Sequence, residues 1–382
     1  MKKLSVLIIL LIVSLTLMSC EQKETPNIKD DDIIVDDVID DDPVDDEPVD
    51  DDPVIDIMDG KFDESFITDL DDILDDAGDI YNLYGISISV DGEIIRELHF
   101  RSRDEQSKNN VFSVTKSVTS LLVGIAIDNG FIESVEQSIG DYIDLSQYET
   151  DDDLSAITIR HLLTMSAGIY WDDENLSSEM INLRSNENPM DLILGRGLSY
   201  VPGTEFNYSD GSAHLVSVIL AEATSMPTEE FAEQYLFTPL GIDSFSWNAD
   251  QNGINIGGCD LFLSNLQMDI IGNLILNKGM HNGVRVVSEE WINESTSNQI
   301  SSFAYHLYGY YWWLSNKWGV PLISARGWGG QQIYIVPDLN LVVTSSSNGF
   351  VSDSTAGSQY VEIEDMVVNE IIKLFIEKSM EE

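Results

Sequence analysis

Ser113 and Lys116 are the two residues of this 382-residue chain whose types and spacing most directly indicate catalysis. A spacing of three places both side chains on one face of a helix, so the lysine amine can reach the serine hydroxyl. A serine hydroxyl needs a neighbouring base at neutral pH, and a lysine serves as one when desolvation and nearby cations lower its pKa. The pair therefore predicts nucleophilic catalysis by Ser113 with Lys116 as its base.

A polar triplet, Tyr208-Ser209-Asp210, precedes an apolar stretch with helical periodicity. From such a loop the side chains can project into a cleft, where Tyr208 would relay a proton between Ser113 and the leaving group. Asp210 would pair with Lys116. The alternative is structural: Ser209 or Asp210 caps the following helix, and Tyr208 is a packing residue.

A third candidate is the glycine-rich segment 326–331, Arg-Gly-Trp-Gly-Gly-Gln, which lies immediately before an apolar strand. Gly327 and Gly329 would allow a substrate to approach the edge of that strand closely. The backbone N–H groups of Trp328 and Ser113 would then form an oxyanion hole, in which each donor is worth roughly 2.7 to 4 kcal/mol. The alternative interpretation is a tight turn between two strands.

The part of the chain before these motifs predicts a helix followed by a hairpin. Residues 62–81 are amphipathic at helical spacing. Residues 85–90 alternate apolar and polar side chains before Asp91-Gly92, a pair that is typical of hairpin turns. The returning strand is expected at 93–100.

The rest of the chain predicts helices first and strands later. Apolar residues recur at helical spacing from 114 to 125, which places Ser113 at a helix start, and the region 131–260 is mainly helical. Later elements are expected as strands at 333–336 and 341–345 and a closing helix at 363–376. This order predicts an α/β fold in which a helical subdomain interrupts a single sheet layer.

In this order the three motifs resemble those of the serine β-lactamase and penicillin-binding-protein-like family, in the branch of class C β-lactamases, DD-peptidases, carboxylesterases and 6-aminohexanoate-dimer hydrolases. The resemblance covers about residues 63–378. Similar framework segments are ITIRHLLTMSAGI (157–169), EEFAEQYLFTPLGIDSFSW (229–247), EEWINES (289–295) and YGYYWWL (308–314). The resemblance implies a β-lactamase/transpeptidase-like fold, an antiparallel sheet flanked by helices with an inserted helical subdomain. It also implies that Ser113 is the acylated nucleophile, Lys116 its base and Tyr208 the proton relay.

Two positions depart from the pattern of this family. Its second motif usually ends in asparagine, whereas Asp210 keeps an acceptor for the lysine but lacks an amide donor for a substrate carbonyl. The third motif of β-lactamases begins with a cation, and aligning Gly327 with the motif's glycine places Ala325 there. The resemblance therefore implies an ester or amide hydrolase rather than an efficient β-lactamase.

The N-terminal segment MKKLSVLIILLIVSLTLMSC has two lysines and a short apolar run that ends at Cys20, as in a secretory signal. The segment 17–20 resembles the lipobox of bacterial lipoproteins, in which the cysteine is acylated and the residues before it are removed. We therefore expect a lipoprotein signal peptide at 1–20 and a protein exported and lipid-anchored to a bacterial membrane through Cys20. The alternative is an uncleaved anchor with an ordinary cysteine.

Residues 21–61 predict a disordered acidic linker ahead of a hydrolase domain at 62–382. Between residues 21 and 60 there are 18 acidic residues and two lysines, and a density of like charge this high prevents collapse. The formal net charge of the chain is −49, which repels phosphate backbones and argues against nucleic acid as a partner.

The histidine and cysteine content predicts neither a metal site nor a disulfide. The five histidines are scattered without metal-ligand spacing, so we expect no metal and no other cofactor. With Cys20 acylated, Cys259 is the one remaining cysteine and is expected to be a core residue.

Together these patterns predict a serine hydrolase that cleaves an ester or amide bond of a small molecule or peptide through a Ser-Lys-Tyr acyl-enzyme mechanism. Two alternatives stay open. One is a β-lactamase or DD-peptidase acting on β-lactams or peptidoglycan peptides. The other is a surface binding protein that has kept the fold and lost the reaction.

Overall fold

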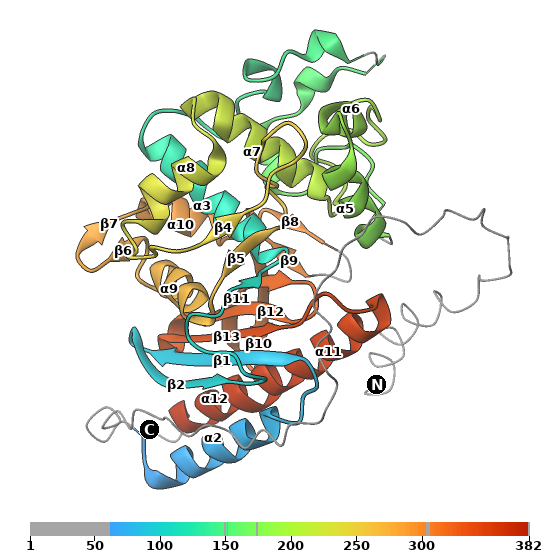
Figure 1. The fold of residues 1–382 in the computed structure, drawn as a ribbon. Helices are drawn as coiled ribbons and strands as arrows, with labels where there is room; N and C mark the ends of the chain where they lie inside the picture. The colour runs from blue at the N-terminus through green and yellow to red at the C-terminus, as the bar shows by residue number, and fades with distance from the viewer. Residues whose placement is uncertain (1–61, 149, 151, 173–174, 303–305, 381–382) are drawn as a thin grey trace, which may run out of the picture. The chain divides into compact units, whose positions relative to one another are not determined.

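An eight-stranded antiparallel sheet with the strand order β2-β1-β13-β12-β11-β10-β9-β8 organises the computed structural model (Figure 1). The structure describes residues 62–148, 150, 152–172, 175–302 and 306–380, so the predicted signal peptide and acidic linker lie outside the described residues. The strands are β1 (Leu83–Val90), β2 (Glu93–His99), β8 (Ile300–Ser301), β9 (Leu307–Tyr308), β10 (Trp313–Lys317), β11 (Val320–Gly327), β12 (Gln331–Val336) and β13 (Leu341–Ser347).

The first and last helices of the described chain cover one face of this sheet (Figure 1). They are α2 (Glu64–Ala77), α11 (Asp353–Asp365), the π-helical segment η8 (Met366–Ile372) and α12 (Lys373–Ser379). Helix α2 begins after Asp63, whose carboxylate accepts the N–H of Phe66, and it buries Phe66 and Leu70 against the sheet. The predicted amphipathic helix and the predicted closing helix are therefore both present.

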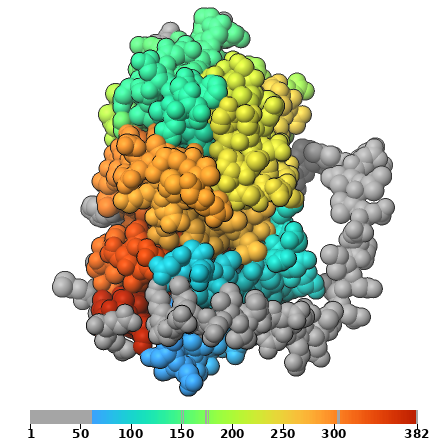
Figure 2. Space-filling view, turned by 90° about the vertical axis from the view of Figure 1, so that its left-hand side faces the viewer, coloured from blue at the N-terminus to red at the C-terminus, as the bar shows by residue number. Residues whose placement is uncertain are grey.

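The opposite face carries α3 (Val114–Asp128), α9 (Asn265–Leu276) and a helical subdomain. The subdomain helices are α4 (Ile159–Leu163), α5 (Leu176–Ser185), α6 (Pro189–Leu194), α7 (Asp210–Thr224), α8 (Thr228–Ala232) and the π-helical η5 (Glu233–Phe237), with short 3-10 turns η2 (Ile139–Asp141), η3 (Leu145–Gln147) and η4 (Leu154–Ala156). In Figure 2 the orange segment with α9 and α10 (Glu289–Ser295) lies between the subdomain and the cyan strands β1 and β2. The predicted helical insertion is thus confirmed.

Smaller elements complete the fold. A three-stranded sheet has the order β3-β5-β4, with β3 (Asn109–Asn110), β4 (Ser246–Trp247) and β5 (Leu261–Leu263). Strands β6 (Met280–His281) and β7 (Val284–Arg285) form a hairpin, and η7 (Pro337–Leu339) joins β12 to β13. No helix in the part of the chain that the structure describes is long and apolar enough to cross a membrane.

Alternate residues of the central strands enter two separate hydrophobic cores. On β12, Ile333 and Ile335 pack with α3 and the helical subdomain, whereas Tyr334 and Val336 pack with the terminal helices. The strand is buried on both faces, and its residues from 333 to 336 are apolar. The part of the sheet that contains β12 is therefore held by hydrophobic packing on both of its faces.

The polar face of β1 is buried rather than solvated. Ser87 and Ser89 are fully buried on the side of the strand that faces α9. Ser89 donates a hydrogen bond to Asp269 Oδ1 at 2.7 Å, and Asn273 Nδ2 donates to Asp269 Oδ2 at 2.8 Å. Burial raises the pKa of the Asp269 carboxyl from 3.8 to about 7, against the opposing effect of these two hydrogen bonds.

Replacement of Asp269 by asparagine tests this buried carboxyl. A carboxyl whose pKa is higher in the folded chain than in the unfolded chain contributes stability below about pH 4, and that contribution is lost as the pH rises through about 7. Asparagine does not titrate, so the difference in unfolding free energy between Asp269→Asn and wild type should shift in favour of the variant by about 2 to 3 kcal/mol between pH 5 and pH 8. Urea unfolding at both pH values measures this shift, and parallel pH dependences of the two proteins would contradict the buried, protonated carboxyl.

Candidate active site

Ser113 lies at the start of α3, as the periodicity predicts. It is the N-cap residue of the helix, with φ −70° and ψ −7°, but its side chain makes no capping hydrogen bond. The half-buried hydroxyl instead accepts a hydrogen bond from Lys116 Nζ at 3.0 Å. The spacing of three residues has therefore brought the two reactive groups together on one face of the helix.

The turn that leads into Ser113 is held in an uncommon backbone conformation. Phe112 has a φ of +46°, a left-handed value that typically costs a non-glycine residue about 1 to 2 kcal/mol. Asn110 Oδ1 accepts the N–H of Phe112 at 2.8 Å, and Asn110 Nδ2 donates to Asp260 Oδ1 at 2.7 Å. Asp260 is in turn paired with Arg184. This chain of hydrogen bonds fixes the backbone immediately before the hydroxyl.

Lys116 is buried, and each of its three ammonium protons has an acceptor. Its Nζ donates to Ser113 Oγ at 3.0 Å, to Asp210 Oδ1 at 2.5 Å and to the carbonyl oxygen of Gly258 at 2.8 Å. The predicted pairing of Asp210 with Lys116 is thus present, and it is an ion pair between two buried side chains.

The expectation that the pKa of Lys116 is lowered is wrong. Burial, the largest single effect, would lower the pKa of this amine, but the charge of Asp210, its hydrogen bond to the amine and the neighbouring Tyr208 and Cys259 together raise the pKa. The Asp210 carboxylate therefore favours the protonated form of Lys116, in which the amine donates a hydrogen bond to Ser113.

In the Tyr208-Ser209-Asp210 triplet, Ser209 has a structural role, whereas Tyr208 and Asp210 lie beside Lys116. Ser209 caps α7, because its Oγ accepts the N–H of Ser212 at 2.9 Å. The Tyr208 ring stacks on Trp313 at 6.0 Å between ring centroids, and Lys116 Nζ lies 4.8 Å from the centre of the Tyr208 ring. Asp210, the first residue of α7, points to Lys116, so the capping alternative applies to Ser209 alone.

The glycine-rich segment joins β11 to β12 close to the backbone before Ser113. Gly329 and Gly330 have φ values of +78° and +110°, which favour glycine, so a tight turn between strands is part of this segment. A Cβ added to Gly327 would lie 2.4 Å from the carbonyl oxygen of Val111, so only glycine allows this approach. Trp328 is half-buried at the first position of the turn.

The edge of β11 is open over the residues that lead to Trp328. Pairing between β10 and β11 ends at Trp313 and Ser324, while pairing between β11 and β12 continues to Gly327. Residues 325–327 therefore have a strand neighbour on one side only. This open edge is the kind of backbone surface to which an extended substrate can bind.

Arg326 does not supply the cation of the third motif. Its guanidinium forms an ion pair with Glu364 of α11 at 3.1 Å, and it lies 5.5 Å from the centre of the Tyr334 ring. Ala325, on the opposite face of β11, is buried in the core that contains α3. The side chains on either side of the strand are thus an apolar methyl group and an arginine that is already paired.

The loop that supplies the third acceptor of Lys116 was not predicted from the sequence. A Cβ added to Gly258 would lie 2.7 Å from Asp210 Oδ1 and 3.3 Å from Lys116 Nζ, so this position requires glycine. The adjacent pair Gly257-Gly258 was the available signal in the sequence. Cys259, the next residue, is a core residue as predicted, and burial raises the pKa of its thiol.

Comparison with known proteins identifies the family. Residues 70–256 match the family model described as Beta-lactamase. The chain therefore contains a domain of the serine β-lactamase family, and its homologues in this family are hydrolases. The predicted α/β fold of the β-lactamase/transpeptidase type is confirmed.

Individual relatives are distant in sequence. A 6-aminohexanoate-dimer hydrolase of Paenarthrobacter ureafaciens is 23% identical over 283 residues, which cover 67% of this chain and 70% of the relative. Among solved structures, a D-stereospecific amidohydrolase from Streptomyces sp. superposes with a TM-score of 0.61 at 18% identity, covering 78% of this chain and 98% of that one. A family VIII carboxylesterase superposes with a TM-score of 0.60 at 16% identity, covering 79% and 97%.

Proposed function

We propose that this protein is an exported, lipid-anchored serine hydrolase that cleaves an ester or amide bond through an acyl-enzyme formed on Ser113. The observation that carries the proposal is the contact between Lys116 Nζ and Ser113 Oγ at 3.0 Å, with the Tyr208 ring beside the same ammonium. The similarity to an amide-dimer hydrolase, an amidohydrolase and a carboxylesterase supports the ester or amide bond as the target.

Because the Asp210 carboxylate favours the protonated form of Lys116, we propose Tyr208 as the group that takes part in proton transfer. In this step Tyr208 reacts as the phenolate: Ser113 Oγ forms a bond to the substrate carbonyl carbon, the carbonyl π electrons move onto its oxygen, and the Ser113 proton passes to the Tyr208 oxygen. Lys116 stays an ammonium and stabilises the negative charge on the serine oxygen. Tyr208 then returns the proton to the departing alcohol or amine as the carbonyl–leaving-group bond breaks. Water repeats the sequence in reverse and releases the acid.

The amides of Ser113 and Trp328 are proposed to bind the oxyanion. The close approach of Gly327 to the carbonyl of Val111 supports this assignment, because it brings the end of β11 to the backbone two residues before Ser113. Gly329 supplies the left-handed turn that follows Trp328. The open edge at residues 325–327 would bind the substrate alongside.

Two features favour an ester or amide over a β-lactam. The carboxylate of a β-lactam needs a cation, but Ala325 is apolar and Arg326 is paired with Glu364. In addition, Asp210 is used by Lys116 and has no amide to donate to a substrate carbonyl. Hydrolysis of a chromogenic cephalosporin at a rate equal to that of the best ester would reverse this preference.

Intact-mass measurement tests the proposal. Protein isolated from membranes is expected to lack residues 1–19 and to carry acyl chains on Cys20. After incubation with a fluorophosphonate, one phosphonyl group should add to the wild type and none to Ser113→Ala, with Ser354→Ala, an exposed serine of α11, as the matched control. A penicilloyl adduct on Ser113 would place the protein with the penicillin-recognising enzymes. A fully folded wild type that forms no adduct would support the binding-protein alternative.

A further inference from the structure

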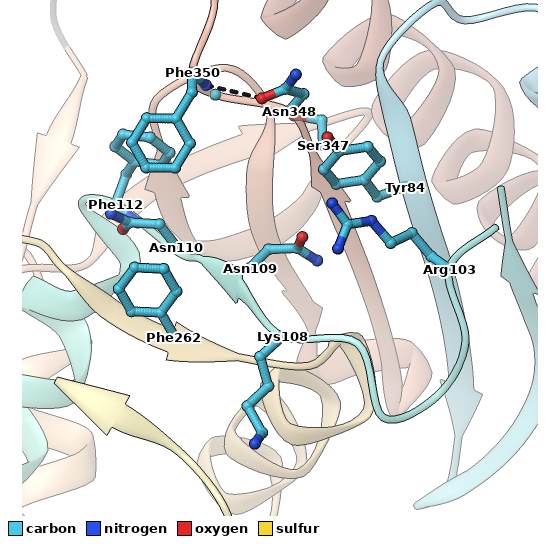
Figure 3. A pocket seen from close by; sticks show the side chains of 11 residues that line it. Tyr84, Arg103, Lys108, Asn109, Asn110, Phe112, Phe262, Ser347, Asn348 and Phe350 are labelled. Atoms are coloured by element: carbon cyan, nitrogen blue, oxygen red, sulfur yellow. Dashed lines mark hydrogen bonds between the residues drawn. The ribbon is translucent and has the colours of Figure 1, made fainter. Parts of the chain in front are cut away.

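A cavity lies beside Phe112, the residue before the proposed nucleophile. Its volume is about 130 Å³, and it is built between the ends of β1, β3, β5 and β13 (Figure 3). Neither Ser113, Lys116 nor Tyr208 lines it. Phe112 forms part of its wall, so the cavity is separate from the cluster around Lys116.

One end of this cavity is positively charged in an otherwise acidic protein. The Arg103 guanidinium lies 4.2 Å from the centre of the Tyr84 ring, a stacked position that leaves its N–H edge available. Within the part of the chain that the structure describes, Arg103 forms no ion pair with a carboxylate. None of the lining residues is acidic, although the chain has 68 acidic and only 19 basic residues.

Asn109 adds an unused polar group at the same end. The residue is only 8% exposed, and its side-chain amide has no hydrogen-bond partner among the described residues. Figure 3 shows this amide pointing to the same space as the Arg103 guanidinium. Because this amide lines the cavity, a ligand that supplies an acceptor can receive a hydrogen bond from it.

The remaining lining residue with a charge does not contribute to this end. Lys108 Nζ donates to Ser244 Oγ, and Figure 3 shows the side chain directed away from Arg103 and Asn109. The amide of Asn110 is likewise engaged, because it bonds Phe112 N and Asp260. Arg103 is therefore the charged lining residue that is available to a ligand, and Asn109 lies beside it with its amide directed into the same space.

The other end of the cavity is aromatic. Phe112 and Phe350 lie with their ring centroids 5.4 Å apart, and Phe262 lines the same space. Phe350 is 67% exposed, a high value for a large apolar side chain. A volume of about 130 Å³ is close to that of an apolar cavity of about 150 Å³ that accepts benzene. The aromatic end thus fits one ring or a short alkyl chain.

We propose that this cavity binds a small organic monocarboxylate, with its carboxylate on Arg103 and Asn109 and its apolar body against Phe112, Phe262 and Phe350. A planar guanidinium binds a planar carboxylate with two parallel hydrogen bonds, and the neighbouring amide donates a third. A compact inorganic anion would leave the aromatic end unfilled, so the organic body is part of the recognition. The site does not depend on the hydrolytic reaction of Ser113.

Calorimetric titration of the whole protein with benzoate tests the site. At about 0.15 M salt, which screens the net negative charge, benzoate should bind with a dissociation constant on the order of 1 mM or lower. Benzamide, which has the same shape without the charge, should bind at least 10-fold more weakly. Inorganic phosphate should bind more weakly than benzoate as well.

Three variants localise the binding. Arg103→Gln should weaken benzoate at least 10-fold, whereas Lys317→Gln, which removes the same charge from an exposed position on β10, should leave it unchanged. Phe350→Ala changes an exposed side chain that the fold does not require, so it remains informative if Arg103→Gln fails to fold, and it should weaken benzoate several-fold. Three results would each overturn the proposal. Benzoate and benzamide could bind equally, or Arg103→Gln and Phe350→Ala could both bind benzoate as tightly as wild type. The third is that wild type shows no binding at a benzoate concentration 10-fold above the expected dissociation constant.

Discussion

Replacement of Lys116 by methionine is expected to reduce ester hydrolysis at least about 1,000-fold and to lower the free energy of unfolding by about 3 to 5 kcal/mol. Methionine keeps an unbranched apolar stem but removes the ammonium that bonds Ser113, Asp210 and Gly258. The Asp210 carboxylate, only 3% exposed, is then buried without a cation. Urea unfolding measures the stability, and hydrolysis of a p-nitrophenyl ester measures the activity.

A second substitution separates the two effects. In Lys116→Met combined with Asp210→Asn, no charge remains in the buried pair, so most of the lost stability should return. The activity should not return, because the group that stabilises the serine oxygen is still absent. A double variant as unstable as Lys116→Met would show that lost packing, not the unpaired carboxylate, is the cause. Recovery of activity together with stability would remove Lys116 from the proposed mechanism.

Elements of the fold were predictable from the sequence where the spacing of apolar residues alone determines whether a segment is a helix or a strand. The hairpin of β1 and β2 follows from an alternating segment and Asp91-Gly92, and the start of α3 follows from apolar residues at helical spacing. The extension of the sheet by β8, β9 and β10 was not predicted. Strands β8 and β9 have two residues each, and such short pairings carry too few residues to show any period.

The site was predictable in its residues but not in its charges. Spacing along α3 brings Lys116 to Ser113, and this follows from helix geometry without any tertiary contact. The protonation state of Lys116 depends instead on how deeply the amine is buried and on a carboxylate 94 positions later in the sequence. No local pattern encodes that balance between desolvation and Coulomb attraction.

The aspartate at position 210, where the family usually has asparagine, thus changes the charge beside Lys116 and with it the pKa of the lysine. An amide at this position would leave the buried lysine without a counter-charge, and burial alone would lower its pKa. The carboxylate reverses the direction of the shift and fixes the proton on Lys116. If the proton of Ser113 does not go to Lys116, it needs another acceptor, and Tyr208, whose ring lies 4.8 Å from Lys116 Nζ, is the candidate that we propose.

Replacement of Tyr208 by phenylalanine therefore tests the mechanism directly. We expect kcat/KM to fall about 100- to 10,000-fold, which is the usual contribution of a general acid–base group. The stability should change by less than about 0.5 kcal/mol. The Tyr208 hydroxyl has no hydrogen-bond partner among the described residues, and phenylalanine keeps the ring that stacks on Trp313 and faces Lys116.

The matched control removes the same hydroxyl from Tyr235, whose ring packs on Phe231 in the helical subdomain, and it should change neither quantity. If Tyr208→Phe keeps full activity, the proton of Ser113 must pass to Lys116, which requires the lysine to lose its proton to solvent or to Asp210 first. In that case kcat/KM of Tyr208→Phe would rise with pH, and Asp210→Asn would move this rise to lower pH because it removes the charge that holds the proton. A large loss in Tyr208→Phe with no such pH dependence is the result expected from an ammonium that keeps its proton throughout the reaction.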